Sequence, residues 1–124
     1  MAENKTLVAV VDDDESFSRA IERLLRAAGF EPFVCVSAEA FLENPRHAAP
    51  DCLVLDIHLG GMSGLDLCRR LAALGRNAPV IFVTAHDEPE AREEARRAGG
   101  MAYFCKPVPG KLLLDAITAA LARN

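Results

Sequence analysis

The chain alternates five times between a short apolar run and a longer segment whose apolar residues recur at helical spacing. Runs of four or five apolar residues indicate strands buried on both faces, whereas spacings of three and four indicate amphipathic helices. Strands that alternate with helices are joined by right-handed crossovers into a parallel sheet with helices on both faces. The sequence therefore predicts one three-layer α/β domain of five βα units over residues 1–124. The expected strands are residues 7–11, 33–36, 52–55, 79–83 and 101–105.

Pro32, which precedes the second apolar run, helps to order the strands. Proline has no N–H group to donate to a neighbouring strand, so within sheets it is found at edges. With the second strand at an edge, the favoured strand order is 2-1-3-4-5, that of a flavodoxin-like, doubly wound parallel sheet. This order places the first and third strands side by side.

Capping residues and glycines predict where the helices begin and end. Asp14, Ser37 and Ser63 are expected to cap the first three helices, and Gly29 and Gly75 to end the first and third. The fourth helix is expected to open at residues 87–89, and the fifth at about residue 110. The side chains expected to face inward are Phe17, Ala20, Ile21, Leu24, Leu25 and Ala28 from the first helix, Leu67, Cys68, Leu71 and Leu74 from the third, and Leu112, Leu113, Ala116, Ile117 and Leu121 from the last.

Composition excludes several classes of function. The net charge of −4 argues against direct binding of nucleic acid or of an anionic membrane surface. The apolar runs are too short to span a bilayer, and the first residues do not form a signal peptide, so we expect a cytoplasmic protein. The four cysteines, none of them in a C-x-x-C pair, are expected to be small buried hydrophobic residues.

Acidic side chains follow two of the predicted strands. Asp12 and Asp13 come directly after the first strand, and Asp56 directly after the third. Because those strands are expected to be neighbours, the three carboxylates should converge, and three charges in one crevice require a cation or a raised pKa. Oxygen ligands favour Mg²⁺, with Mn²⁺ also possible, over zinc. His58 and His86 are expected at the rim of this site rather than as zinc ligands, and His47 in an exposed loop.

Four motifs at these strand ends resemble the receiver domain of two-component response regulators. They are VVDDDES at the first strand, LVLDIHLGGMSGLDL at the third, VTA at the fourth and KPV after the fifth. The resemblance covers essentially the whole chain. It implies a phosphorelay switch in which Asp56 accepts a phosphoryl group from a phosphohistidine of a sensor histidine kinase or a histidine phosphotransfer protein. The domain would then not be an ordinary enzyme, but would catalyse its own phosphorylation and dephosphorylation.

The resemblance also implies roles for other residues of this chain. Asp13 and Asp56 match direct Mg²⁺ ligands, Asp12 matches a carboxylate that acts through water, and the backbone carbonyl of His58 matches a further ligand. Lys106 matches the lysine that pairs with the phosphoryl group, and the bond between it and Pro107 resembles one that is cis in the family. Thr84 and Tyr103 match the two switch residues. Gly60 stands where the family usually has proline, so we expect a more mobile loop after Asp56.

The fourth helix is expected to be weakly anchored, because its apolar stripe consists of Ala91, Ala95 and Ala98. Ion pairs from Glu88 to Arg92 and from Glu93 to Arg97 are expected on its outer face. A helix held by three alanines shifts easily, so the surface of the fourth helix, fifth strand and fifth helix is expected to carry the signal. The recipient is either a downstream effector protein or an output domain of a longer chain.

Three other functions fit parts of the pattern. A flavodoxin-type FMN protein shares the topology, but the three aspartates after the first strand would repel the FMN phosphate. A phosphatase with an aspartate nucleophile typically has a D-x-D pair, whereas His58 follows Asp56 at the second position. A docking module of the same fold that works without phosphorylation remains the main alternative, although the set of Asp12, Asp13, Asp56, Thr84 and Lys106 argues against it.

Overall fold

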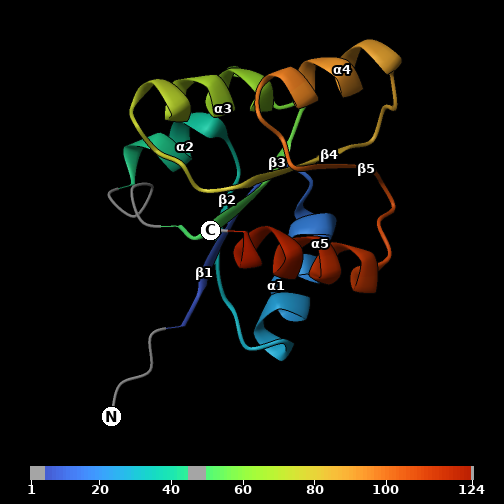
Figure 1. Ribbon diagram of the computed structural model, residues 1–124. Helices are drawn as coiled ribbons and strands as arrows, with labels where there is room; N and C mark the ends of the chain where they lie inside the picture. The colour runs from blue at the N-terminus through green and yellow to red at the C-terminus, as the bar shows by residue number, and fades with distance from the viewer. Residues whose placement is uncertain (1–4, 45–49, 124) are drawn as a thin grey trace.

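The computed structural model describes residues 5–44 and 50–123. The positions of His47 and of the expected helix end at Pro45 lie outside these residues. Strands and helices alternate strictly along the chain, as predicted (Figure 1). The elements are β1 (Leu7–Val11), α1 (Glu15–Ala27), β2 (Glu31–Cys35), α2 (Ala38–Glu43), β3 (Cys52–Asp56), α3 (Gly64–Ala73), β4 (Val80–Thr84), α4 (Pro89–Arg97), β5 (Ala102–Cys105) and α5 (Gly110–Ala122).

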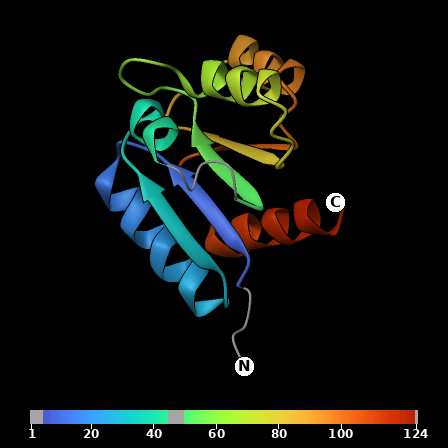
Figure 2. The ribbon, with the colours of Figure 1, turned by 90° about the vertical axis from the view of Figure 1, so that its left-hand side faces the viewer.

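The five strands form one parallel sheet in the order β2-β1-β3-β4-β5, which confirms the predicted flavodoxin-like topology (Figure 2). Pro32 lies within the edge strand β2, opposite Val8 of β1. The neighbouring Glu31 N–H donates to the Thr6 carbonyl at 2.8 Å. Because successive residues of a strand turn their N–H groups to opposite sides, the nitrogen of Pro32 faces the open edge of the sheet, where no donor is needed.

Helices cover both faces of the sheet, with α2, α3 and α4 on one face and α1 and α5 on the other (Figure 1). Strand β1 shows how one apolar run serves both layers. Its residues Leu7, Ala9 and Val11 belong to the core under α2, α3 and α4, whereas Val8 and Val10 belong to the core under α1 and α5. This alternation explains why the run is apolar throughout. In the described part of the chain, no helix has the length and apolarity that crossing a bilayer requires.

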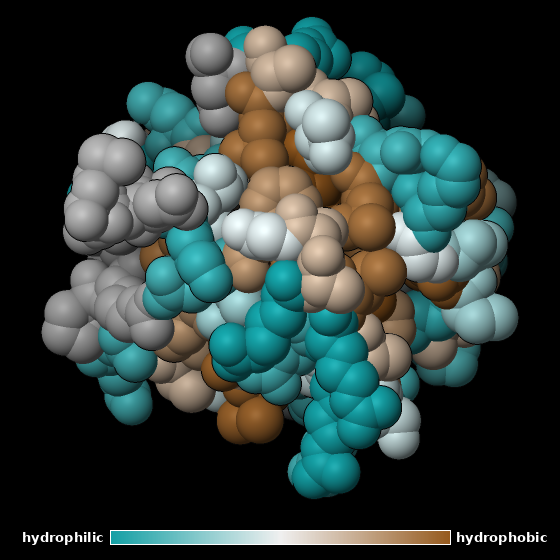
Figure 3. Space-filling model, turned by 90° about the horizontal axis from the view of Figure 1, so that it is seen from below, coloured by the Kyte–Doolittle hydropathy of each residue, from teal (hydrophilic) through white to brown (hydrophobic). Residues whose placement is uncertain are grey.

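The face formed by α1 and α5 shows apolar residues gathered between hydrophilic ones (Figure 3). These residues are half-buried and pack against the core beneath the two helices. They include Phe17, Leu24, Phe30, Leu114 and Leu121.

The predicted caps of the first three helices form. Asp14 accepts a hydrogen bond from the Phe17 N–H at 3.1 Å. Ser37 and Ser63 each accept one in the same way from the N–H three residues later. Gly29 and Gly75 follow α1 and α3 with φ of +92° and +79°, a conformation that favours glycine.

Several predicted inward-facing residues are exposed, and that part of the prediction is wrong. Leu74 and Leu112 are each 50% exposed. Leu74 is the residue after the last turn of α3, where the chain already turns away from the sheet. Leu112 lies about 100° around α5 from Leu113, whose side chain points into the core. Ala20 and Ala28 of α1 are also exposed.

The bounds of the strands and the burial of one cysteine also differ from prediction. Strand β2 begins two residues earlier than expected and ends before Val36, which is 67% exposed. Strands β4 and β5 each begin one residue later than expected. All four cysteines are free, and three of them are buried. Cys105 is exposed because it ends β5, a strand at the open edge of the sheet.

Helix α4 packs through small side chains. Ala91 and Ala95 are buried against the sheet, and Ala98 is half-buried. The expected ion pair between Glu93 and Arg97 is present at 3.1 Å. The expected partner of Arg92 was wrong, because its guanidinium lies 3.3 Å from the Asp87 carboxylate instead of beside Glu88.

Candidate functional site

Three carboxylates meet at the carboxyl end of the sheet. Asp12 and Asp13 directly follow β1, and Asp56 is the last residue of β3. Because Val11 of β1 lies opposite Leu55 of β3, these acids leave the sheet side by side. One carboxylate oxygen from each acid lies within 4.8 Å of the others. Asp12 and Asp56 are only 1% and 5% exposed, whereas Asp13 is open to solvent.

Lys106 brings a cation to the acids from the edge of the sheet formed by β5. It follows β5, and its N–H donates to the Thr84 carbonyl at 2.7 Å, which extends the pairing of β4 and β5. Its Nζ lies 2.8 Å from Asp12 Oδ2, 3.6 Å from Asp56 Oδ2 and 3.7 Å from Asp14 Oδ2. The peptide bond between Lys106 and Pro107 is cis.

Burial dominates the electrostatics of Asp12. It raises the pKa of this carboxyl from 3.8 to about 6, and the charge of Asp56 adds to the rise. Hydrogen bonds from Lys106 and from the Asp14 N–H oppose it. Burial also acts on Lys106 by lowering its pKa, but its contacts with Asp12, Asp56 and Asp14 outweigh that effect, so the pKa of Lys106 is raised. The crevice therefore holds negative charge that one ammonium group compensates only in part.

The oxygen atoms of the cluster suit a further hard cation. Asp12 Oδ1 accepts the Asp14 N–H at 2.8 Å, and the buried Oδ2 is paired with the Lys106 ammonium at 2.8 Å. Carboxylate oxygens that converge from separate elements, one of them at a solvent-open position, are the donors that Mg²⁺ or Mn²⁺ binds while keeping several waters. The residues of the described cluster fit such an ion.

The backbone after β3 fixes the orientation of the Asp56 carboxylate. The His58 N–H donates to Asp56 Oδ1 at 3.0 Å, which leaves Oδ2 on the side of Lys106. Gly64, the first residue of α3, packs directly on the Asp56 carbonyl, where a Cβ atom would overlap the oxygen. Only glycine therefore lets the loop return so closely beneath Asp56.

Thr84 lies deep in the sheet, and its hydroxyl is engaged within its own turn. Its side chain is fully buried at the end of β4, the neighbour of β3. The hydroxyl donates to the His86 carbonyl at 3.1 Å and accepts the His86 N–H at 3.0 Å. The structure thus places Thr84 beside the strand that carries Asp56, with hydrogen bonds to its own loop.

The partly buried side chain of Tyr103, in contrast, contacts residues at and just before the start of α4. Its hydroxyl donates to Asp87 Oδ1 at 3.3 Å, and the Arg92 guanidinium stands 4.5 Å from the ring centroid. Burial and the Asp87 carboxylate raise the pKa of the phenol. Tyr103 is therefore tied to the start of α4 and is not part of the acid cluster.

Two histidines stand at the rim of the crevice. The rings of His58 and His86 pack edge to face, with their centroids 5.6 Å apart. His58 Nε2 lies 3.9 Å from Glu88 Oε1. These side chains connect the loop after β3 with the loop after β4.

Two contacts at the site had not been predicted from the sequence. Phe17 of α1, expected only as a core residue, lies beneath Lys106, with Nζ 4.4 Å from the ring centroid. Glu39 of α2 accepts the Met62 N–H at 2.8 Å in the loop after β3. No local pattern distinguishes either residue from an ordinary helix position, because both contacts depend on how α1 and α2 pack on the sheet.

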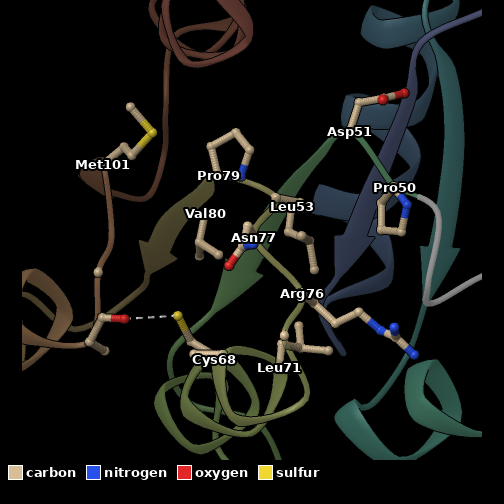
Figure 4. Close-up of a pocket in the computed structure, with 15 residues that line it drawn as sticks. Pro50, Asp51, Leu53, Cys68, Leu71, Arg76, Asn77, Pro79, Val80 and Met101 are labelled. Carbon is tan, nitrogen blue, oxygen red and sulfur yellow. Dashed lines mark hydrogen bonds between the residues drawn. The ribbon is translucent and has the colours of Figure 1, made fainter. Parts of the chain in front are cut away.

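A hollow lies elsewhere in the described part of the chain, at the amino ends of β3 and β4 (Figure 4). Its volume is about 660 Å³, and Leu53, Leu71 and Val80 form its apolar floor. The Cys68 thiol on its wall donates to the Ala98 carbonyl at 3.3 Å. The polar groups of this hollow do not converge, so the acid cluster remains the candidate functional site.

Comparison with known proteins gives one consistent result. Residues 8–118 match the family model described as the response regulator receiver domain. Nodulation protein W of Bradyrhizobium diazoefficiens is 37% identical over 123 residues, which cover 99% of this chain and 54% of that protein. The response regulator protein TmoT of Ectopseudomonas mendocina is 37% identical over 121 residues, which cover 98% of this chain and 55% of the relative. The chain thus spans about half the length of these curated relatives.

A solved structure of a response regulator shares the fold. The solved structure of the response regulator StyR has a TM-score of 0.88 and 40% identity, and the match covers 98% of this chain and 61% of that one.

Proposed function

This chain belongs to the response regulator receiver domain family, and from that membership we propose that its Asp56 is the phosphoacceptor of a two-component phosphorelay. The observation that carries the proposal is the contact of Lys106 with both Asp12 and Asp56 at the bottom of a three-carboxylate cluster. The donor is a phosphohistidine of a sensor histidine kinase or of a histidine phosphotransfer protein. The receiver unit is residues 1–124, and we propose that it acts in the cytoplasm.

The chemistry follows from how Asp56 is held. The His58 N–H fixes Oδ1, so Oδ2 is the oxygen that attacks phosphorus in line with the departing histidine nitrogen. The new bond is an acyl phosphate, and the bond from phosphorus to the imidazole nitrogen breaks, with its electron pair leaving on the imidazole. Lys106 is placed to pair with one oxygen of the transferred group. In a later and separate step, the same residues would admit water, which attacks phosphorus and breaks its bond to Asp56 Oδ2, so that inorganic phosphate leaves and the carboxylate is regenerated. The chain would in this way catalyse its own phosphorylation and dephosphorylation.

The acid cluster also supplies the site for a divalent ion. We propose Asp13, Asp56 and the backbone carbonyl of His58 as direct ligands, and Asp12 as a ligand through water. Bound there, Mg²⁺, or Mn²⁺ in its place, would neutralise charge on the phosphoryl oxygens. The convergence of one carboxylate oxygen from each of Asp12, Asp13 and Asp56 within 4.8 Å of one another supports this assignment.

Thr84 and Tyr103 are the proposed switch. A phosphoryl group on Asp56 adds strong acceptors beside β4. We propose that the Thr84 hydroxyl then leaves its hydrogen bonds with His86 and turns toward the new oxygen atoms. Tyr103 would leave Asp87 at the same time, which frees the start of α4. The surface of α4, β5 and α5 would then bind a downstream effector protein or an output domain.

Intact-mass spectrometry after incubation with Mg²⁺ and a small phosphodonor such as acetyl phosphate tests the proposal. The wild-type chain should gain one phosphoryl group, and Asp56→Asn should gain none. Asp66→Asn, which changes an exposed acid on α3, is the matched control and should behave as wild type. No mass gain in the wild-type chain would favour the phosphorylation-independent docking module. An equal gain in Asp56→Asn would assign the acceptor to another residue.

A further inference from the structure

The loop after Asp56 has a tip built for close approach to another element. The tip comprises residues 60–62, two glycines and Met62. Gly61 has a φ of +77°, and a Cβ atom there would lie 2.7 Å from Glu39 Oε2. A side chain at this position would therefore strain the backbone and push the Glu39 carboxylate away from the loop. The absence of a side chain is what lets the carboxylate of α2 reach the tip.

Glu39 makes a specific contact there. Its Oε2 accepts the Met62 N–H at 2.8 Å across 23 positions of sequence. Hydrogen bonds from Met62 and from its own backbone lower the pKa of Glu39, so the acceptor is a carboxylate at neutral pH. In the described part of the chain, this is the one hydrogen bond between the tip and another element.

The base of the loop is anchored separately. The Gly64 N–H donates to the Ile57 carbonyl at 3.1 Å, which closes the loop at its neck. Between neck and tip lies His58, whose N–H holds Asp56 Oδ1. Glycine rather than proline at position 60 leaves the backbone of the tip without stiffening there. The tip is therefore held by Met62, whose side chain packs against the core and whose N–H is bound by Glu39.

We propose that Glu39 is a positioning residue of the phosphoacceptor site. By accepting the Met62 N–H, it holds the tip of the loop and thereby keeps the His58 backbone in place against Asp56. The effect reaches both the attacking carboxylate and the carbonyl that is the proposed metal ligand. This inference rests on the proposed function, since it assigns Glu39 a part in that same site.

Two substitutions and a control separate positioning from charge and from general stability. Glu39→Ala removes the acceptor, whereas Glu39→Gln keeps an acceptor oxygen without the charge. Glu43→Ala removes an exposed acid one turn later on α2 that makes no hydrogen bond or ion pair with the described loop residues. The measurements are Mg²⁺ affinity by calorimetry, the phosphorylation rate with acetyl phosphate at saturating Mg²⁺, and hydrogen exchange of the Met62 amide.

Glu39→Ala should expose the Met62 amide to exchange and weaken Mg²⁺ binding by about three- to tenfold, the effect of losing one ordinary solvent-exposed hydrogen bond. Glu39→Gln should recover most of the affinity, and Glu43→Ala should leave it unchanged. A faster Met62 amide in Glu39→Ala with Mg²⁺ affinity and phosphorylation rate both within about twofold of wild type would refute the positioning role. Wild-type protein that neither binds Mg²⁺ nor becomes phosphorylated would instead refute the proposed function.

Discussion

The acid cluster and the surface of α4, β5 and α5 lie on adjoining parts of the molecule but are held in different ways. At the cluster, Asp12, Asp56 and Thr84 are at most 5% exposed, and each accepts a hydrogen bond from a nearby backbone N–H. On the surface beside it, α4 contacts the sheet through small side chains such as Ala91 and Ala95. Its outer face carries exposed ion pairs, which stabilise little.

From this difference in packing, we expect the acid cluster to be rigid and α4 to be the more mobile element. In-line attack on phosphorus requires oxygen atoms held in a narrow range of positions, which the backbone hydrogen bonds and burial of the cluster provide. The proposed switch requires an element with two arrangements of similar free energy, and the small apolar stripe of α4 makes this helix the candidate for that element. Thr84, with its buried hydroxyl, stands between the two regions.

The largest effect is expected at the cluster, from Lys106→Met. The change removes the cation that lies 2.8 Å from Asp12 Oδ2 and 3.6 Å from Asp56 Oδ2. Phosphorylation by a small phosphodonor should slow by about 100- to 1000-fold, the usual cost of one positioned donor at a developing charge. The rate is measured by intact mass at saturating Mg²⁺.

Lys111→Met is the control, since this lysine of α5 is 85% exposed and pairs only with Asp115 among the described residues. If Lys106→Met is phosphorylated as fast as Lys111→Met, Lys106 does not contribute to phosphorylation. The claim that the acid cluster is the part of the molecule organised for chemistry would then be contradicted.

A smaller effect is expected from the raised pKa of Asp12. Well below the ordinary pKa of 3.8 this carboxyl is protonated in the folded and unfolded states alike, so its raised pKa costs no stability there. As pH rises from 3.8 to about 6, the unfolded chain releases the proton while the folded chain still holds it, and the loss of stability is complete above the folded pKa of about 6. Without metal, the free energy of unfolding should therefore fall by up to about 3 kcal/mol from this residue.

Urea unfolding at pH 4 and pH 7.5 in the presence of a chelator measures this loss. Asp12→Asn should flatten the pH dependence and raise stability at pH 7.5, while weakening the binding of Mg²⁺. Asp66→Asn should leave the wild-type pH dependence in place. If Asp12→Asn keeps the wild-type pH dependence of stability, the raised pKa of Asp12 is not its cause.

The smallest effect is expected on α4. Ala95→Gly should lower the free energy of local opening of α4 by about 1 kcal/mol, because glycine is a poorer helix former and leaves a small gap against the sheet. Amide hydrogen exchange in α4 should become about fivefold faster, while exchange in α3, anchored by Leu67 and Leu71, stays unchanged. If the amides of α4 exchange more slowly than those of α3 in the wild-type chain, α4 is not the more weakly anchored helix, and the contrast drawn above is wrong.

The pattern of the sequence predicted the strand order and the meeting of the acids. Pro32 indicated the edge strand, and the order then placed Asp12 and Asp13 beside Asp56. Lys106 was associated with this site only through resemblance to a family, because nothing local shows that a lysine after the edge strand reaches across β4. The exposure of Leu74 and Leu112 was missed, since helical spacing alone does not say where a helix leaves the sheet.

The sequence by itself determined the elements, their caps and the end of the sheet at which the acids gather, because those features depend on residue type and on spacing along the chain. Only the tertiary structure decided which side chains from other elements complete the site. Phe17 beneath Lys106 and Glu39 on the loop after β3 are such cases. Contacts of this kind depend on how each helix is rotated and seated on the sheet, and that packing is set by the whole core at once.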